Sequence, residues 1–170
     1  MSFICIDLGP ETSSLFDRIK VPEGTVTEDR KHVTLFFIPK EVETVKNFYM
    51  AVEILRRVIG STRPPTLLCS EVTTFSKGED GFPIICPVRS IGLFEVRRTI
   101  AEAFDRNGVA YSKKFPKYQP HVTLGYTPED IQGREMRSPI IWTANNVTHY
   151  FSSEAETNAQ ELSVDVPFAL

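Results

Sequence analysis

The sequence predicts an α+β fold made of two halves of similar structure. Segments with the two-residue alternation of strands and segments with the periodicity of helices follow one another along the 170 residues. The tetrapeptide His-Val-Thr-Leu also occurs twice, at residues 32–35 and 121–124, in a chain with only three histidines. A histidine is followed by Val-Thr-Leu by chance about once in a few thousand cases. The repeat therefore indicates an internal duplication, and we expect residues 1–170 to form a single domain of two lobes with one motif in each.

The first half of the chain is predicted to contain two strands and two helices. Its clearest element is the second helix, because apolar residues recur there at three- and four-residue spacing and Gly60 ends the pattern. Gly9-Pro10 ends the opening strand, and Pro39 ends the strand of the first motif. In chain order, the predicted elements are a strand at 3–8, a helix at 11–20, a polar loop at 22–31, the first motif strand and a helix at 41–59.

The second half is predicted to contain a β-hairpin, one helix and several further strands. Residues 77–81 are rich in turn formers, so the strands on either side are expected to pair as the hairpin. Asn107-Gly108 ends the helix. In chain order, the predicted elements are strands at 66–75 and 82–89, a helix at 91–106, a loop at 111–119, the second motif strand, an irregular excursion at 127–138, short strands at 140–142 and 147–151, and a last strand at 162–168.

The two motifs are expected to present matching polar pairs on one face of a strand. Successive side chains of a strand point to opposite faces, so histidine and threonine share a face while valine and leucine face a core. We expect Phe37 to continue the buried side of the first motif, and Lys31 to point away from its polar side. The two polar pairs are then expected to meet in one open cleft that holds His32, Thr34, His121 and Thr123.

Two imidazoles and two hydroxyls around one point suit the cleavage of a phosphodiester. Imidazole has an unperturbed pKa of about 6.5, so one neutral ring can accept a proton from the nucleophile while one protonated ring donates to the leaving oxygen. Threonine hydroxyls can donate hydrogen bonds to the non-bridging phosphate oxygens. No metal is required, and a zinc site is not expected because the motifs supply too few ligands. His149 has no threonine at the matching offset and is predicted to be a core residue.

The composition excludes several other classes of protein. A formal net charge of −3 argues against a protein that covers long tracts of nucleic acid. The cysteines are odd in number and lie in apolar runs, which indicates buried thiols in a reducing compartment, at Cys5, Cys69 and Cys86. The N-terminus has no signal-peptide pattern, and no segment reaches the roughly 18 apolar residues of a membrane span. We therefore expect a cytoplasmic protein that has no membrane partner.

The loop before the second motif combines basic and aromatic side chains. Such residues can steer phosphates and stack a nucleobase, and the alternative is a solvated loop whose aromatic side chains fold inward. Tyr118 and Tyr126 are the candidate stacking residues. The other members of this mixed set are Tyr111, Lys113, Lys114, Phe115 and Lys117.

Both motifs resemble the His-x-Thr/Ser-x signatures of the two-histidine (2H) phosphoesterase superfamily. That superfamily includes 2′-5′ RNA ligase-like proteins, 2′,3′-cyclic phosphodiesterases and nucleases that degrade 2′-5′ oligoadenylates or phage-defence cyclic oligonucleotides. The likeness extends to the opening strand at 3–7, to residues 71–75 before the hairpin and to residues 115–126. It implies a fold of two antiparallel sheets that form a central cleft, with helices on the outer faces.

The resemblance also implies roles for the motif residues. His32 and His121 would be the catalytic acid and base, in an order that the sequence leaves open, and Thr34 and Thr123 would bind phosphate without a cofactor. The expected activity is cleavage of a 2′,3′-cyclic phosphate, a 2′-5′ linkage or a cyclic oligonucleotide signal, the last in evasion of phage defence. The expected partner is a nucleotide, an oligonucleotide or an RNA end, and the protein is expected to be a monomer.

Two further hypotheses remain at this point. The first is a binding module that sequesters nucleotides or RNA ends with little turnover. It predicts that replacing the motif histidines would leave ligand binding largely intact. The second is a 2H enzyme whose substrate is not a nucleotide.

Overall fold

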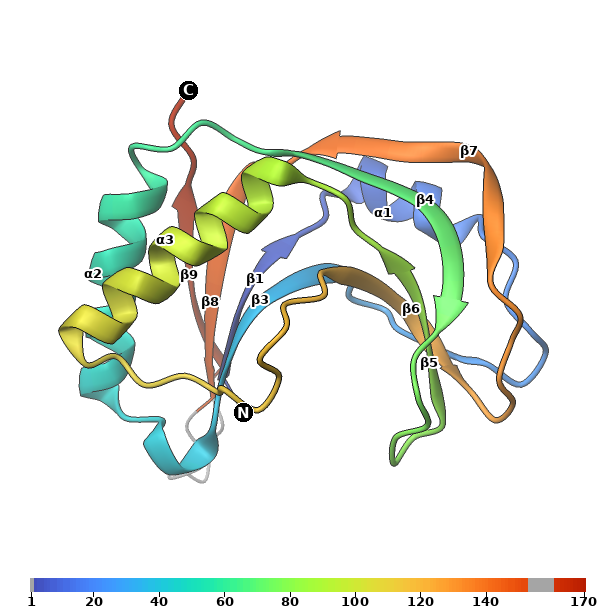
Figure 1. Ribbon diagram of the computed structural model, residues 1–170, viewed down its shortest axis with the longest axis horizontal. Coiled ribbons are helices and arrows are strands. Elements are labelled where there is room, and N and C mark those ends of the chain that lie inside the picture. The colour runs from blue at the N-terminus through green and yellow to red at the C-terminus, as the bar shows by residue number, and fades with distance from the viewer. Residues whose placement is uncertain (1, 153–160) are drawn as a thin grey trace.

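The computed structural model describes residues 2–152 and 161–170, which form an arch of strands flanked by helices (Figure 1). The strands are β1 (Ser2–Asp7), β2 (Val26–Thr27), β3 (His32–Ile38), β4 (Thr66–Thr74), β5 (Phe82–Pro87), β6 (His121–Thr127), β7 (Arg134–Thr143), β8 (Asn146–Ser152) and β9 (Glu161–Pro167). The helices are α1 (Pro10–Asp17), α2 (Val45–Ile59) and α3 (Ile91–Asn107), with a 3₁₀ turn, η1 (Lys40–Val42), before α2.

All the strands belong to one antiparallel sheet of nine strands, in the order β7-β4-β5-β6-β3-β1-β8-β9, with β2 paired to β6. The predicted α+β class is confirmed. The two expected sheets are the halves of this continuous sheet, and they meet where Val33 of β3 pairs with Val122 of β6. The motif strands lie at the centre of the arch (Figure 1).

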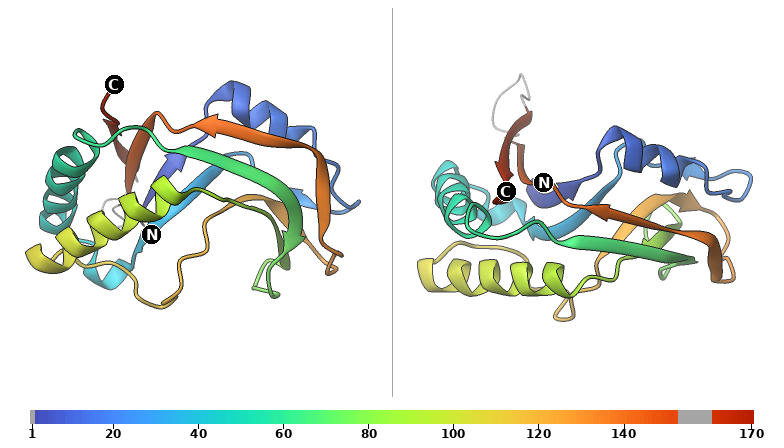
Figure 2. Two further views of the ribbon diagram at one scale, coloured as in Figure 1. Left: turned by 45° about the horizontal axis from the view of Figure 1, so that its top comes forward. Right: turned by 90° about the horizontal axis from the view of Figure 1, so that it is seen from above.

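Helices cover both halves of the sheet. Phe48 of α2 contacts Phe151 of β8, with ring centroids 5.0 Å apart. On the other half, Phe16 of α1 meets the ring of Trp142 edge-on at 5.5 Å. The two views in Figure 2 show α1 far from α2 and α3, which lie together at the opposite end of the molecule. This arrangement leaves the middle of the sheet, where the motifs lie, free of a covering helix.

The two halves repeat the same strand pairing. In β1 with β3, Asp7 lies opposite His32, and in β5 with β6, Pro87 lies opposite His121. Both registers shift by one residue at the same place, so Leu35 is left unpaired in β3 and Leu124 in β6. A β-bulge is a specific feature of a strand, and the same bulge occurs here at the same position in both halves. The two motif strands therefore have the same backbone pairing and the same bulge.

The bulge overturns the predicted position of Phe37. Leu35 and Phe36 are both only 2% exposed, whereas Phe37 is 42% exposed. An extra residue in a strand shifts every later side chain to the opposite face, so strict alternation fails beyond Leu35. Phe37 therefore lies on the open face with the motif polar residues, and Phe36 takes its expected place in the core.

Three predicted boundaries were also wrong. The second part of the excursion at 127–138 is strand, because β7 begins at Arg134 and pairs with β4. Its first six residues are mostly exposed, so no apolar alternation marked it as an edge strand. Helix α2 begins at Val45, because the Thr44 side chain accepts a hydrogen bond from the Asn47 amide at 3.0 Å and caps the helix. Helix α1 ends at Asp17, three residues before the predicted end at residue 20.

The three cysteines and His149 are core residues, as predicted. The three cysteines are buried and free, and burial raises the pKa of each thiol, to about 12 for Cys86. His149 is 1% exposed and lies against Phe48, with ring centroids 4.7 Å apart. Burial lowers the pKa of His149 to about 4, so the ring is neutral near pH 7. No helix in the described part of the chain is long and apolar enough to cross a membrane.

Gly125, beside the bulge of β6, is predicted not to tolerate a side chain. A Cβ atom there would meet the Val26 carbonyl oxygen and lie 3.0 Å from the Cα of Thr27, so no side chain fits between β6 and β2. We expect Gly125→Ala to lower the free energy of unfolding by about 1–3 kcal/mol. Gly9→Ala is the matched control, because a Cβ at Gly9 has no neighbour within 4 Å and φ there is −64°. Urea denaturation measures both, and equal stability of the two variants would contradict the packing described.

Candidate active site

The motif strands lie side by side and share one polar face. Val33 and Val122 form the pair that joins β3 to β6, and both are fully buried. The antiparallel register set by this pair brings His32 beside Thr123 and His121 beside Thr34 on the opposite face. The two histidines are therefore diagonal neighbours, a relation that separates Cα atoms by about 7–8 Å.

Each histidine is anchored in the same way. The Nδ1 atom of His32 lies 3.0 Å from the carbonyl oxygen of Arg30, and that of His121 lies 2.8 Å from the carbonyl oxygen of Gln119. A carbonyl oxygen only accepts hydrogen bonds, so Nδ1 carries a proton in both rings and donates it. The second nitrogen, Nε2, then has its lone pair available in the neutral form. Both halves thus hold the imidazole through Nδ1 in the same way.

An aromatic ring from a neighbouring segment supports each imidazole. Phe3 stacks on His32 with ring centroids 5.2 Å apart and an interplanar angle of 29°. Phe75 meets His121 edge-on, at 4.7 Å and 81°. These contacts limit the rotation of the rings about their side-chain bonds, which keeps Nε2 in one direction. Phe75 lies in the segment 71–75 that resembles the 2H superfamily, although its contact with His121 was not predicted.

The electrostatic surroundings distinguish the two histidines. Burial lowers the pKa of His121, and the charge of nearby His32 lowers it further, while the hydrogen bond to the Gln119 carbonyl partly offsets both effects. His121 is therefore neutral near pH 7. The influence of His32 on this pKa also reflects how near the two rings lie to each other.

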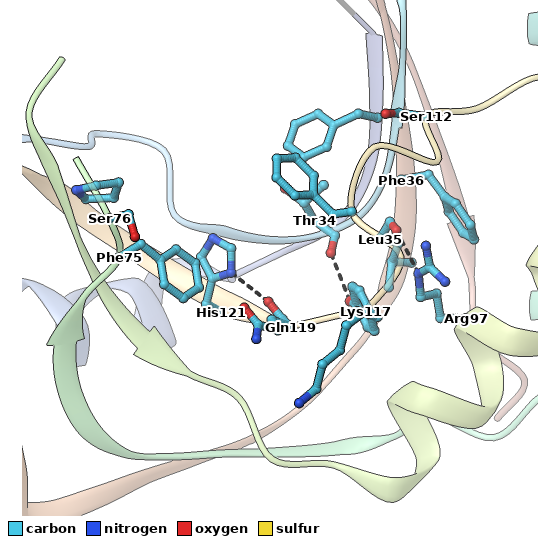
Figure 3. A pocket seen from close by; sticks show the side chains of 14 residues that line it. Thr34, Leu35, Phe36, Phe75, Ser76, Arg97, Ser112, Lys117, Gln119 and His121 are labelled. Carbon is cyan, nitrogen blue, oxygen red and sulfur yellow. Dashed lines mark hydrogen bonds between the residues drawn. The ribbon is translucent and has the colours of Figure 1, made fainter. Parts of the chain in front are cut away.

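A pocket of about 460 Å³ opens on the His121 side of the motifs (Figure 3). His121 and Thr34 are among its lining residues, together with the aromatic side chains of Phe37, Phe75, Phe115 and Tyr118. His32 and Thr123 are not among its lining residues, so the pocket extends to one side of the motif pair.

Tyr118 forms part of the wall and also connects it to the first motif. Its hydroxyl donates a hydrogen bond of 2.8 Å to the carbonyl oxygen of Thr34. The guanidinium of Arg97, from α3, lies 4.6 Å from the centre of the Tyr118 ring, and Arg97 Nε donates to the Leu35 carbonyl at 3.2 Å. Figure 3 shows the hydrogen bond between Arg97 of α3 and Leu35 of β3. An arginine on the polar side of a helix looks solvated in the sequence, so nothing there marked Arg97.

Some residues of the basic and aromatic loop line the pocket, and others fold inward or lie away from it. Phe115 and Lys117 line the pocket. Tyr111 folds inward against Phe36, and Lys113 pairs with Asp105 at 3.0 Å, away from the pocket.

Two further predictions concern Tyr126 and Lys31. Tyr126 lies outside the pocket, opposite Val26 of β2 and Pro83 of β5. Lys31 points away from the motif face, as predicted, and its side chain pairs with Asp17. Among the residues that the structure describes, no group of three His, Cys, Asp or Glu side chains is arranged to hold a metal ion.

The protein is a curved antiparallel sheet that carries a symmetric pair of anchored histidines at its centre. The sequence profile of the 2′-5′ RNA ligase superfamily matches residues 20–163. The chain therefore belongs to this superfamily. No curated protein sequence matches it.

Solved structures share the fold at low sequence identity. The TT0787 protein of Thermus thermophilus has a TM-score of 0.74 at 11% identity, over 98% of this chain and 97% of that one. E. coli LigT in complex with 3′-AMP has a TM-score of 0.66 at 16% identity, over 99% and 98% of the two chains. The PDE domain of MHV ns2 has a TM-score of 0.55 at 12% identity, over 97% and 99%.

The anchoring of the histidines predicts their tautomer and titration. Nitrogen-15 NMR, recorded at a pH at which both imidazoles are neutral, is expected to show a protonated Nδ1 and an unprotonated Nε2 in His32 and His121. His121 is expected to titrate with a pKa below the ordinary 6.5, and His32→Gln should restore only part of the difference, because burial is the larger cause. A protonated Nε2 in the neutral rings, or a pKa of His121 above 6.5, would contradict this geometry.

Proposed function

We propose that this protein is a metal-independent phosphodiesterase. His32 and His121 are its acid-base pair, and the hydroxyls of Thr34 and Thr123 hold the phosphate between them. The observation that carries the proposal is the matched pair of Nδ1-to-carbonyl hydrogen bonds on neighbouring strands, which leaves both Nε2 atoms for proton transfer across one phosphate. Membership of the 2′-5′ RNA ligase superfamily supports the same chemistry.

The lowered pKa of His121 favours this residue as the base. In the hydrolysis of a 2′,3′-cyclic phosphate, Nε2 of neutral His121 accepts a proton from water while the water oxygen bonds to phosphorus. Nε2 of protonated His32 donates its proton to the ribose oxygen as the bond from phosphorus to that oxygen breaks. Hydrogen bonds from the threonine hydroxyls to the non-bridging oxygens stabilise the charge that develops there.

The proposed substrates are nucleotides with an RNA-type phosphodiester. Exposed aromatic side chains at the pocket mouth, Phe37 and Phe115, suit the stacking of a nucleobase. E. coli LigT, which shares the fold, forms complexes with 3′-AMP, ATP and NADP+. A 2′,3′-cyclic phosphate, a 2′-5′ linkage and a cyclic oligonucleotide signal of phage defence all contain such a nucleotide. We extend the proposal to a monomer that acts in the cytoplasm, in keeping with its free, buried cysteines.

The competing function is a binding module that sequesters nucleotides without turnover. The pocket alone accommodates either function, because an aromatic wall beside a phosphate site binds ligand with or without chemistry. The matched anchoring of the histidines favours the enzyme, because acid-base cleavage requires two imidazoles whose Nε2 atoms both face the phosphate. Both functions predict ligand binding, so product formation separates them.

The enzyme is tested by incubation in EDTA with 2′,3′-cyclic nucleotides, 2′-5′ oligoadenylate and 3′-5′ cyclic oligonucleotides, with products identified by mass. We expect turnover of at least one of these substrates. His32→Ala and His121→Ala should each reduce kcat by about 10²–10⁴-fold, the usual effect of removing one general acid or base. Lys46→Ala, at an exposed position of α2, is the control that should retain activity. Loss of activity in EDTA, or activity in the double histidine variant, would contradict the mechanism.

A further inference from the structure

The two histidines have equivalent backbone settings but differently charged surroundings. The pocket on the His121 side is lined by the cations Arg97 and Lys117 and by no aspartate or glutamate. Within the described residues, neither cation forms an ion pair. Arg97 is held by the Leu35 carbonyl and by the rings of Phe36 and Tyr118, none of which neutralises its charge. This half of the cleft therefore carries uncompensated positive charge against aromatic walls.

The His32 side of the cleft is charge-balanced or acidic. Arg30 lies 3.5 Å from the carboxylate of Asp7, and its guanidinium stacks over Tyr150 at 3.7 Å. Tyr150 donates a hydrogen bond to the same carboxylate. An additional anion on this side would meet the Asp7 carboxylate, with which Arg30 already forms an ion pair.

We propose that the pocket on the His121 side binds a second phosphate group of the substrate. The preferred substrates are then nucleotides that carry a further phosphate beyond the scissile one, such as a 5′-phosphorylated nucleotide or an oligonucleotide, oriented with that phosphate toward Lys117 and Arg97. The inference rests on the proposed function, since it assumes that the motifs hold the scissile phosphate. Low-dielectric walls strengthen the attraction of an anion to unpaired cations, and the Asp7 carboxylate on the His32 side disfavours the reverse orientation.

Binding of two probe nucleotides tests the proposal. Adenosine 3′,5′-bisphosphate and 3′-AMP differ by one phosphate, and calorimetry measures the dissociation constant of each with the whole protein. We expect the bisphosphate to bind about tenfold more tightly or better, the effect of one charge-assisted hydrogen bond. Lys117→Gln should remove most of this difference and leave the affinity for 3′-AMP within about twofold, because it takes away only the contact to the second phosphate.

Lys113→Gln is the matched control. Lys113 lies on the same loop, but Asp105 neutralises it and it does not line the pocket, so this variant should retain the full preference for the bisphosphate. Equal affinities of the wild-type protein for the two nucleotides, binding of neither, or equal weakening of both by Lys117→Gln would overturn the proposal. Circular dichroism of each variant verifies its fold.

A kinetic measurement separates this proposal from the proposed function. If adenosine 2′,3′-cyclic phosphate is turned over and a 5′-phosphate does not lower its KM, the second-phosphate site fails while the phosphodiesterase stands. If neither compound is turned over but the binding preference depends on Lys117, the phosphodiesterase fails and the second-phosphate site stands, in a binding module.

Discussion

The pairing of Val33 with Val122 is the contact on which the rest of the structure depends. Both side chains are fully buried, and this residue pair joins β3 to β6. Burying two valines fixes the register of the strands, because a slip of one residue would turn every side chain to the wrong face. With the register fixed, His32 and His121 are diagonal neighbours on the open side. The geometry of the site thus follows from an apolar contact on the opposite side of the sheet.

The site is symmetric in its backbone and asymmetric in its surroundings. The two halves repeat one strand register, one bulge and one hydrogen bond from a histidine to a main-chain carbonyl. Main-chain interactions of this kind depend little on side-chain identity, which allows the halves to differ elsewhere. Aromatic side chains and uncompensated cations gather beside His121, while Arg30 and Asp7 pair beside His32. One fold thereby supplies two equivalently anchored imidazoles in surroundings of different charge.

The sequence predicted the features that depend on local patterning. The α+β class, the helix that ends at Asn107 and the hairpin between β4 and β5 all follow from periodicity and turn residues. Features that depend on contacts between distant segments were missed. Phe37 faces the pocket because of a bulge, β7 has too few apolar residues to show alternation, and Arg97 reaches the pocket only through tertiary packing. The Leu35-Phe36 doublet was the one local sign that alternation breaks.

A crystal structure of the protein with inorganic phosphate tests the central claim most directly. The account predicts one phosphate ion between the motif strands, with Nε2 of His32 and Nε2 of His121 each within about 2.7–3.2 Å of its oxygens, and with Thr34 and Thr123 as further donors. A phosphate ion that contacts only one of the two histidines, or that binds away from both, would contradict the claim that the duplicated motifs form one site.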